Sequence, residues 1–316
     1  MINFSTLKHT KQTGNYLPVF ICNLTNLYIF YKILPRGGVT MKNLDIKLEN
    51  SPLIYRSKLT IPSHINFGLE LELDKVDYDE VRDLVRREFN DIFLVKVDDS
   101  LTKGQSAEIV TPVLRNNKET WILLKRLGEL LQRLNPDYSL CSFQVNFDGS
   151  LLPWNEDKVR FLKLFAMYED IIYRFSLGED DSFRESIETY AYPIIWMMKS
   201  IKSHGDDSIV DMFSKNKRYG IVFKENPDLI EFRSPNMSSN PIMWQNYVTT
   251  FYYLIEASIS KKLDMKKIDY YIDHFYKSYI LENYSLEKKD KAIEFCDLIF
   301  KKSDDSISFM HQYLKK

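Results

Sequence analysis

Several stretches of the chain alternate between apolar and polar residues with the two-residue period of a half-buried β-strand. The alternation is cleanest in CSFQVNFD, residues 141–148, where phenylalanine and valine take turns with glutamine, asparagine and aspartate. The segment INFGLELEL at 65–73 repeats the pattern with leucine and glutamate. These patterns predict strands at 65–73, 92–97, 106–114, 140–148, 219–224 and 229–233, the last two joined as a hairpin at Asn226-Pro227.

Other segments carry apolar residues at the spacing of an amphipathic helix. Val81, Val85 and Phe89 define one such face, and a stripe of leucine and isoleucine further along ends at Asn135-Pro136. Pro193 is expected to break a later helical pattern. The predicted helices span 77–90, 118–134, 156–177 and 183–201, and after Pro241 we expect helix to the end of the chain in about three segments.

The predicted strands and helices do not follow the regular βαβ alternation of a parallel sheet. This order predicts an α+β fold with a mainly antiparallel sheet flanked by helices. We expect residues 41–63 to form a polar lead-in and residues 64–316 to form the main domain, with a helical C-terminal part at about 241–316. No internal repeat or low-complexity linker divides this domain.

The composition narrows the class of protein. Of 316 residues, 44% are hydrophobic, which is enough for a large core, and 43 basic against 44 acidic residues give no bias toward nucleic acid. Three widely spaced cysteines form no CxxC pair or disulfide framework, which predicts a cytoplasmic protein. The five histidines lack zinc-like spacing, and the GxGxxG and GxxxxGK[ST] phosphate loops are absent from the sequence.

The first forty residues allow more than one interpretation. Residues 17–34 are apolar but contain two asparagines and Lys32, so they are short and costly as a membrane span, and they lack the cleavage site of a signal peptide. Arg36-Gly37-Gly38 can be encoded as a purine-rich ribosome-binding sequence shortly before Met41. Residues 1–40 are therefore either translated upstream DNA, with Met41 as the true start, or an N-terminal arm without fixed structure.

The polar sides of the predicted strands are rich in acids and amides. Glu70 and Glu72 share one side of a strand, Glu108 lies on a second strand, and Glu231 shares a side with Arg233 on a third. A solvated outer face explains each strand taken alone. Clustered carboxylates repel one another unless a cation lies between them, and Mg²⁺ binds through carboxylates together with substrate phosphates. The set therefore predicts a cavity for Mg²⁺ and a nucleotide without a glycine loop.

An ordered series of motifs resembles the amidoligase family of carboxylate–amine ligases, in the superfamily of glutamine synthetase and glutamate–cysteine ligase. The family motifs FGxExE, DGSL, E-[IVL]-[TS]-P, [IV]EFR and N-x-[ST]-x-N are matched in order by Phe67-Gly-Leu-Glu70-Leu-Glu72, Asp98-Asp-Ser-Leu101, Glu108-Ile-Val-Thr-Pro112, Ile230-Glu-Phe-Arg233 and Asn236-Met-Ser-Ser-Asn240. Arg184 and Tyr192-Pro193 fit an arginine and a Tyr-Pro-like element of the family. The resemblance covers about residues 65–260. It implies a glutamine synthetase-like fold whose sheet lines the active-site cavity.

The central strand departs from the amidoligase pattern, which normally reads CGLHVHVD. Gln144 and Asn146 replace both histidines, the first of which corresponds to a metal ligand. Plant-type glutamate–cysteine ligases look like TxxVQVNLD at this strand, and the QVN of this chain is similar to theirs. Because an amide oxygen is a hard ligand compatible with Mg²⁺, we interpret Gln144 as a working ligand. The alternative is a catalytically decayed site.

By this resemblance, ATP phosphorylates a carboxylate and an amine then displaces the phosphate to give an amide or peptide bond. The resemblance implies Glu70, Gln144 and Glu231 as ligands of a nucleotide-side Mg²⁺ (or Mn²⁺), and Glu72, Asp98 and Glu108 as ligands of a metal nearer the acyl phosphate. Arg233 would clamp phosphate, Asn146 would contact it, and Arg184 would bind the acidic substrate or the phosphate. The implied partners are small-molecule or peptide carboxylates and amines.

Two other functions are compatible with the same residues. A glycoside hydrolase would use two acids such as Glu70 and Glu231, and it would need no ATP. A nucleotide-binding or scaffold protein would keep the fold around a decayed site. ATP hydrolysis that depends on an added amine separates these three functions. The sequence does not name the acid or the amine.

Overall fold

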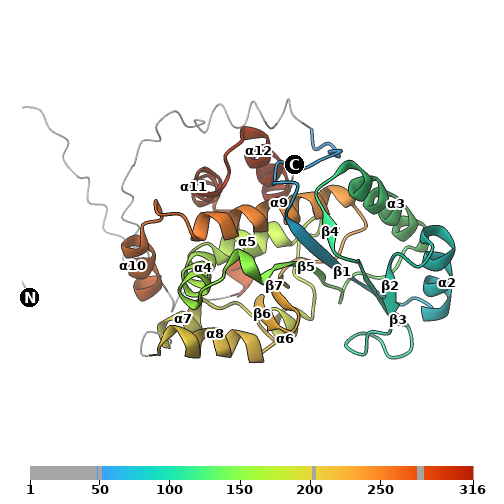
Figure 1. The fold of residues 1–316 in the computed structure, drawn as a ribbon, viewed down its shortest axis with the longest axis horizontal. Coiled ribbons are helices and arrows are strands. Elements are labelled where there is room, and N and C mark those ends of the chain that lie inside the picture. The colour runs from blue at the N-terminus through green and yellow to red at the C-terminus, as the bar shows by residue number, and fades with distance from the viewer. Residues whose placement is uncertain (1–47, 49–51, 201–203, 276–280, 316) are drawn as a thin grey trace, which may run out of the picture. The chain divides into compact units, whose positions relative to one another are not determined.

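One sheet organises the part of the chain that this computed structural model describes, which is Leu48 and residues 52–200, 204–275 and 281–315. The strands follow the order β2-β3-β1-β5-β7-β6, and β4 pairs with β1 beside this path. Each described pair is antiparallel, so the predicted α+β fold with an antiparallel sheet is confirmed (Figure 1). The strands are β1 (Asn66–Asp74), β2 (Leu94–Lys96), β3 (Ser106–Val110), β4 (Leu114–Arg115), β5 (Phe143–Asp148), β6 (Ile221–Glu225) and β7 (Asp228–Phe232).

Helices lie between the strands along the chain and follow them, and all described residues belong to one compact unit. Those before the β6–β7 hairpin are α2 (Tyr78–Phe89), α3 (Lys118–Leu134), α4 (Asn155–Met167), α5 (Glu169–Ser176), α6 (Ile187–Tyr190), α7 (Ile195–Ser200) and α8 (Asp206–Lys215). Those after it are α9 (Pro241–Ser258), α10 (Met265–Phe275), α11 (Lys289–Ile299) and α12 (Ser303–Leu314), with 3₁₀ turns η1 (Gly149–Leu151) and η4 (Leu281–Ser285). No helix of these described ranges is long and apolar enough to cross a membrane.

The predicted elements agree with the structure where local signals are strong. Helix α3 has the predicted bounds because Asn117 accepts a hydrogen bond from the Thr120 amide at its start, and Asn135 ends it in the left-handed conformation with φ 46°. The β6–β7 hairpin turns at Asn226-Pro227 as predicted. Pro193 lies between α6 and α7, as the sequence also predicts.

The structure differs from the predicted elements where a continuous sequence pattern corresponds to two separate elements. The segment expected to be one strand at 106–114 is divided into β3 and β4, because Pro112 has no amide hydrogen for the ladder. The helix expected at 156–177 is two helices that meet at Tyr168. Helix α8 was not predicted, and the chain after Pro241 holds four described α-helices instead of about three.

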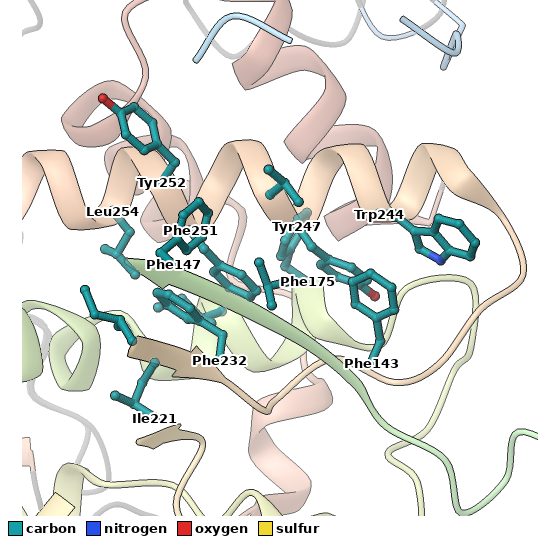
Figure 2. Packing of buried hydrophobic residues seen from close by; sticks show 14 of the residues in the cluster. Phe143, Phe147, Phe175, Ile221, Phe232, Trp244, Tyr247, Phe251, Tyr252 and Leu254 are labelled. Atoms are coloured by element: carbon teal, nitrogen blue, oxygen red, sulfur yellow. The ribbon is translucent and has the colours of Figure 1, made fainter. Parts of the chain in front are cut away.

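The apolar face of the sheet forms the core. Helix α9 runs along β5 and β7, and Figure 2 shows Phe143, Phe232, Trp244 and Phe251 between the helix and these strands. The Phe232 and Phe251 rings are stacked with centroids 4.1 Å apart, and Phe143 stacks on Trp244 at 5.7 Å. These side chains are fully buried, so burial of large aromatic rings fixes which face of each strand points inward.

The predicted lead-in packs on the same core wherever the structure describes it. Leu59 and Ile61 are buried in the hydrophobic cluster, and the Asn116 side chain accepts from the Leu59 amide at 2.9 Å and donates to the Leu59 and Ile61 carbonyls. Arg56 pairs with the buried Asp305 of α12 at 2.5 Å. Packing is therefore continuous across the predicted boundary at residue 63. The predictions for residues 1–40 and for most of 41–51 lie outside the described residues.

Candidate polar site on the sheet

The register of the strands brings the predicted site residues to one face of the sheet. Residues directly opposite each other on antiparallel strands point to the same face. Glu70 of β1 lies opposite Gln144 of β5, and Asn146 of β5 lies opposite Glu231 of β7. On the other flank of β1, Glu72 lies opposite Glu108 of β3. The acids and amides of four strands therefore share the face opposite the aromatic core.

A lysine from the edge strand β6 reaches into this face. Lys224 of β6 extends its ammonium group to Glu70 Oε1, at 3.4 Å, and into contact with Glu231 Oε2. The Glu231 side chain is completely buried, whereas that of Lys224 is 24% exposed. Burial alone would lower the pKa of Lys224, but the charges of Glu231 and Glu70 raise it, so the ammonium group stays charged at neutral pH.

Arg233 approaches Glu231 from the other side. Its Nη1 donates to Glu231 Oε1 at 2.7 Å and to Gln144 Oε1 at 3.3 Å, and its Nε donates to the carbonyl of Tyr190 at 2.9 Å. The buried carboxylate of Glu231 therefore lies between two cations. This arrangement compensates its charge and fixes the orientation of the Arg233 guanidinium group.

The two amides of β5 connect the acids. Gln144 Nε2 donates to Glu72 Oε1 at 3.2 Å, and Asn146 Nδ2 donates to Glu70 Oε1 at 2.7 Å. The other Asn146 atom, Oδ1, is buried and has no hydrogen-bond partner among the described residues. Because an unpaired buried acceptor costs free energy, Asn146 Oδ1 is the place where this site is most ready to accept a donor or a cation.

Glu108 and Glu70 form a carboxyl–carboxylate pair. Burial and the hydrogen bond to Glu70 raise the pKa of Glu108 to about 7, although Lys96 Nζ lies 3.1 Å from Glu108 Oε2. Burial would also raise the pKa of Glu70, but the hydrogen bond from Glu108 and the charge of Lys224 lower it. The opposite pKa shifts are those expected for two close carboxyl groups that interact directly.

Glu72 is held by the protein on both of its oxygens. Besides the contact with Gln144, its Oε2 accepts from the Ser142 amide at 2.6 Å. Burial raises the pKa of Glu72 despite these hydrogen bonds. Both oxygens of Glu72 therefore already have donors within the protein.

Asp98 does not enter the hydrogen-bonded cluster. Its Oδ1 accepts from the Ser100 amide at 2.9 Å and from the Ser100 hydroxyl at 2.6 Å, which is a local turn. Its charge contributes to the raised pKa of Glu72, so it lies near the site without a described contact to it. In the described ranges, no group of three or more histidine, cysteine or acidic residues is arranged to hold a metal ion.

Arg184 is buried behind the site, and it donates to three backbone carbonyls and to one serine hydroxyl. Its Nη1 donates to the carbonyls of Ser234 and Pro235, its Nη2 to that of Arg233 at 2.8 Å, and its Nε to Ser186 Oγ at 3.1 Å. Burial lowers its pKa to about 10. In this arrangement Arg184 holds the segment that follows β7, and thereby positions Arg233.

The sequence analysis singled out neither Lys96 of β2, which contacts Glu108, nor Lys224. The signal was present in IVFKE, because Val222 and Lys224 occupy the same side of β6, and Val222 lies opposite Glu231. A cavity of about 510 Å³ adjoins the lysine. Its lining includes residues of α4, α8, β6 and β7: Asn155, Lys158, Asp207, Asp211, Phe223, Lys224, Glu225 and Asp228.

Comparison with known proteins does not assign this chain to a family. Neither a protein-family model nor a curated protein sequence matches it. The functional argument therefore depends on the charges and donors of the sheet face. These are three acids that face a lysine or an arginine, and two amides, of which Asn146 has a buried Oδ1 without a hydrogen-bond partner among the described residues.

Proposed function

We propose that this protein is an ATP-dependent carboxylate–amine ligase with a glutamine synthetase-like catalytic fold. The observation that carries the proposal is the arrangement around the buried Glu231, which lies between Lys224 and Arg233 on a sheet face that also presents Glu70, Gln144 and Asn146. The motif resemblance adds to it, because Glu70, Glu231 and Arg233 stand at family motif positions, and Gln144 and Asn146 resemble the strand of plant-type glutamate–cysteine ligases. In the proposed reaction, a carboxylate attacks the γ-phosphorus of ATP and ADP leaves, after which an amine displaces phosphate from the acyl phosphate.

The side chains of the site suit the demands of phosphoryl transfer. That reaction needs positive charge and fixed donors more than covalent chemistry, because its transition state spreads negative charge over the phosphoryl oxygens. Arg233 is held by Glu231 and by the Tyr190 carbonyl, so it keeps its direction without a ligand. Lys224 adds a second positive charge at the same carboxylate. We assign Arg233 and Lys224 to the phosphates, and Asn146 to their orientation.

The oxygen donors fit a hard divalent cation at one of the two predicted positions. Carboxylate oxygens of Glu70 and Glu231, the amide oxygen of Gln144 and the unpaired Oδ1 of Asn146 are ligand types that Mg²⁺ and Mn²⁺ accept. When bound there, the ion would offset the charge of the nucleotide phosphates. The second predicted set, Glu72, Asp98 and Glu108, fits less well, because Asp98 is held in a local turn with Ser100 and has no described hydrogen bond or ion pair with Glu72 or Glu108.

The glycoside hydrolase alternative is less consistent with the electrostatics. Such an enzyme needs one carboxyl group with a raised pKa to protonate the leaving group. The pKa of Glu70 is lowered, and Glu231 has a cation at each oxygen. Neither member of the predicted pair therefore has the environment of a general acid.

The cysteines Cys141 and Cys296 are free and buried, and we place the ligase in the cytoplasm on the basis of cysteine usage.

The experiment that tests the ligase proposal traces an isotopically labelled oxygen atom from the carboxylate substrate to inorganic phosphate. The full chain is incubated with ATP, Mg²⁺, amines and a panel of carboxylates labelled with ¹⁸O, and the inorganic phosphate released is analysed by mass spectrometry. An acyl-phosphate mechanism transfers one labelled oxygen from the carboxylate to phosphate. We expect labelled phosphate with one of the acids, its loss in Arg233→Gln, and its retention in Arg82→Gln, an arginine on the exposed side of α2.

Two outcomes would redirect the proposal. Binding of ATP without cleavage under any substrate combination would make the protein a nucleotide-binding module. Failure of the wild-type chain to bind ATP, measured by calorimetry in the presence of Mg²⁺, would overturn the proposed function.

A further inference from the structure

Lys224 contacts two carboxylates on the polar face of the sheet. The neighbouring acids Glu225 and Asp228 lie opposite each other at the β6–β7 turn, and by strand alternation they belong to the other face. The ammonium group instead reaches inward to Glu231, whose side chain is completely buried, and to Glu70. A buried carboxylate requires compensating charge, and the ammonium group supplies it together with the Arg233 guanidinium group.

The same position has the donors of a cation site. Two carboxylates meet there, and Asn146 adds a buried oxygen, Oδ1, that has no partner among the described residues. Asn146 also contacts Glu70 through its Nδ2 at 2.7 Å, so its amide belongs to the same cluster. Without the ammonium group, Glu70 and Glu231 would repel each other unless a proton or a metal ion took its place.

We propose that Lys224 is a built-in cation, which occupies the position between Glu70 and Glu231 that a divalent ion would otherwise take, and thereby limits metal binding by the free protein. The inference rests on the proposed function, in that it treats these carboxylates as the nucleotide-side cation position of the ligase site. A metal ion then enters this position only when Lys224 moves away from the carboxylates. Lys224 thus determines which cation the site holds before the nucleotide arrives.

The test compares metal binding in variants without nucleotide. Mn²⁺ affinity of the full chain is measured by electron paramagnetic resonance for wild type, Lys224→Met and Lys158→Met. Lys158 is the matched control. It lines the same cavity as Lys224, but its Nζ lies over the Phe223 ring, 5.4 Å from the ring centroid. We expect Lys224→Met to bind Mn²⁺ at least about tenfold more tightly than wild type, because it uncovers two carboxylates. Lys158→Met should bind it as wild type does.

Thermal unfolding gives a second and independent readout. Lys224→Met should melt at a lower temperature than wild type in the presence of a chelator, and Mn²⁺ should restore much of the loss, since a ligand that binds only the folded state stabilises it. Adding Glu231→Gln to Lys224→Met should abolish both the tighter binding and the restoration. Lys224→Arg, which keeps the charge, should show neither effect.

Each outcome decides the inference. Equal Mn²⁺ affinity in wild type and Lys224→Met would overturn it, and so would tighter binding that survives Glu231→Gln. If Lys224→Met does not fold in the presence of chelator, folding in the presence of Mn²⁺ supports the inference, and failure to fold there overturns it. These measurements need neither ATP nor turnover, so a wild-type chain that fails to bind ATP would remove the ligase proposal and leave this result standing.

Discussion

Arg233 Nη1 lies 2.7 Å from Glu231 Oε1, a contact between two side chains of one segment that are only two residues apart. The spacing places both on the same face of the sheet, and the contact with Lys224 at the other oxygen makes Glu231 the centre of a row of alternating charges. Because the carboxylate is completely buried, removal of either partner changes the charge balance of the whole face.

Glu70→Ala and Glu231→Ala are expected to lose Mg²⁺-dependent binding of ATP. Glu70 and Glu231 supply the carboxylate oxygens of the position that fits a divalent ion, and Glu231 also orients Arg233. Glu231→Ala should further lower the free energy of unfolding by about 3 kcal/mol, because it leaves two cations without their buried partner. Calorimetry with ATP and Mg²⁺ measures the first effect, and Glu156→Ala on the exposed surface of α4 is the control. Normal ATP binding by both variants would show that the site is assigned wrongly.

Gln144→Leu is expected to reduce ATP turnover by about 100-fold, the size of effect seen when one preorganised polar group is removed from an active site. The amide connects Arg233 to Glu72, and leucine keeps its size while removing both contacts. Gln144→His should retain part of the activity and shift the metal preference from Mg²⁺ toward Mn²⁺. Stability should change by only about 1 kcal/mol in Gln144→Leu. An unchanged rate of turnover in that variant would show that Gln144 has no catalytic part.

Glu108→Gln is expected to flatten the pH dependence of stability between about pH 4.5 and pH 7. Burial and the hydrogen bond to Glu70 raise the pKa of Glu108 from 4.5 to about 7 in the folded protein. The folded state therefore binds this proton more tightly than the unfolded chain, so the free energy of unfolding falls as pH rises through that range. Urea unfolding at pH 5 and pH 7.5 measures the difference for wild type and variant. Identical slopes would mean that Glu108 titrates normally.

A chain that begins at Met41 should unfold at the same temperature as the full chain, whereas a chain that begins at Ile65 should be less stable by about 4 kcal/mol. The second deletion removes the buried side chains of Leu59 and Ile61, each of which contributes about 2 kcal/mol through burial. It also removes the partners of Asn116. Differential scanning calorimetry compares the three chains. A large loss of stability in the Met41 chain would place residues 1–40 within the fold.

Local patterns in the sequence were sufficient for most individual elements. Alternation of apolar and polar residues predicted β1 and β5 within a few residues, because one face of each strand is buried against aromatic rings. Capping by Asn117 and termination at Asn135 fixed α3 at its predicted bounds. The division at Tyr168 was not visible, since the apolar spacing continues through it from α4 into α5.

The pairing of the strands was decided only by the tertiary structure. The sequence indicated that Glu70, Gln144, Asn146 and Glu231 lie on the polar sides of their strands, but each side could equally have faced water. Which residues lie opposite one another depends on the register of the paired strands. That register is set by contacts between segments that are far apart in the chain. The place of Lys224 between two acids follows from the register as well. The alternation in IVFKE indicates the side of the strand on which Lys224 lies, but its partners on other strands are reached through space.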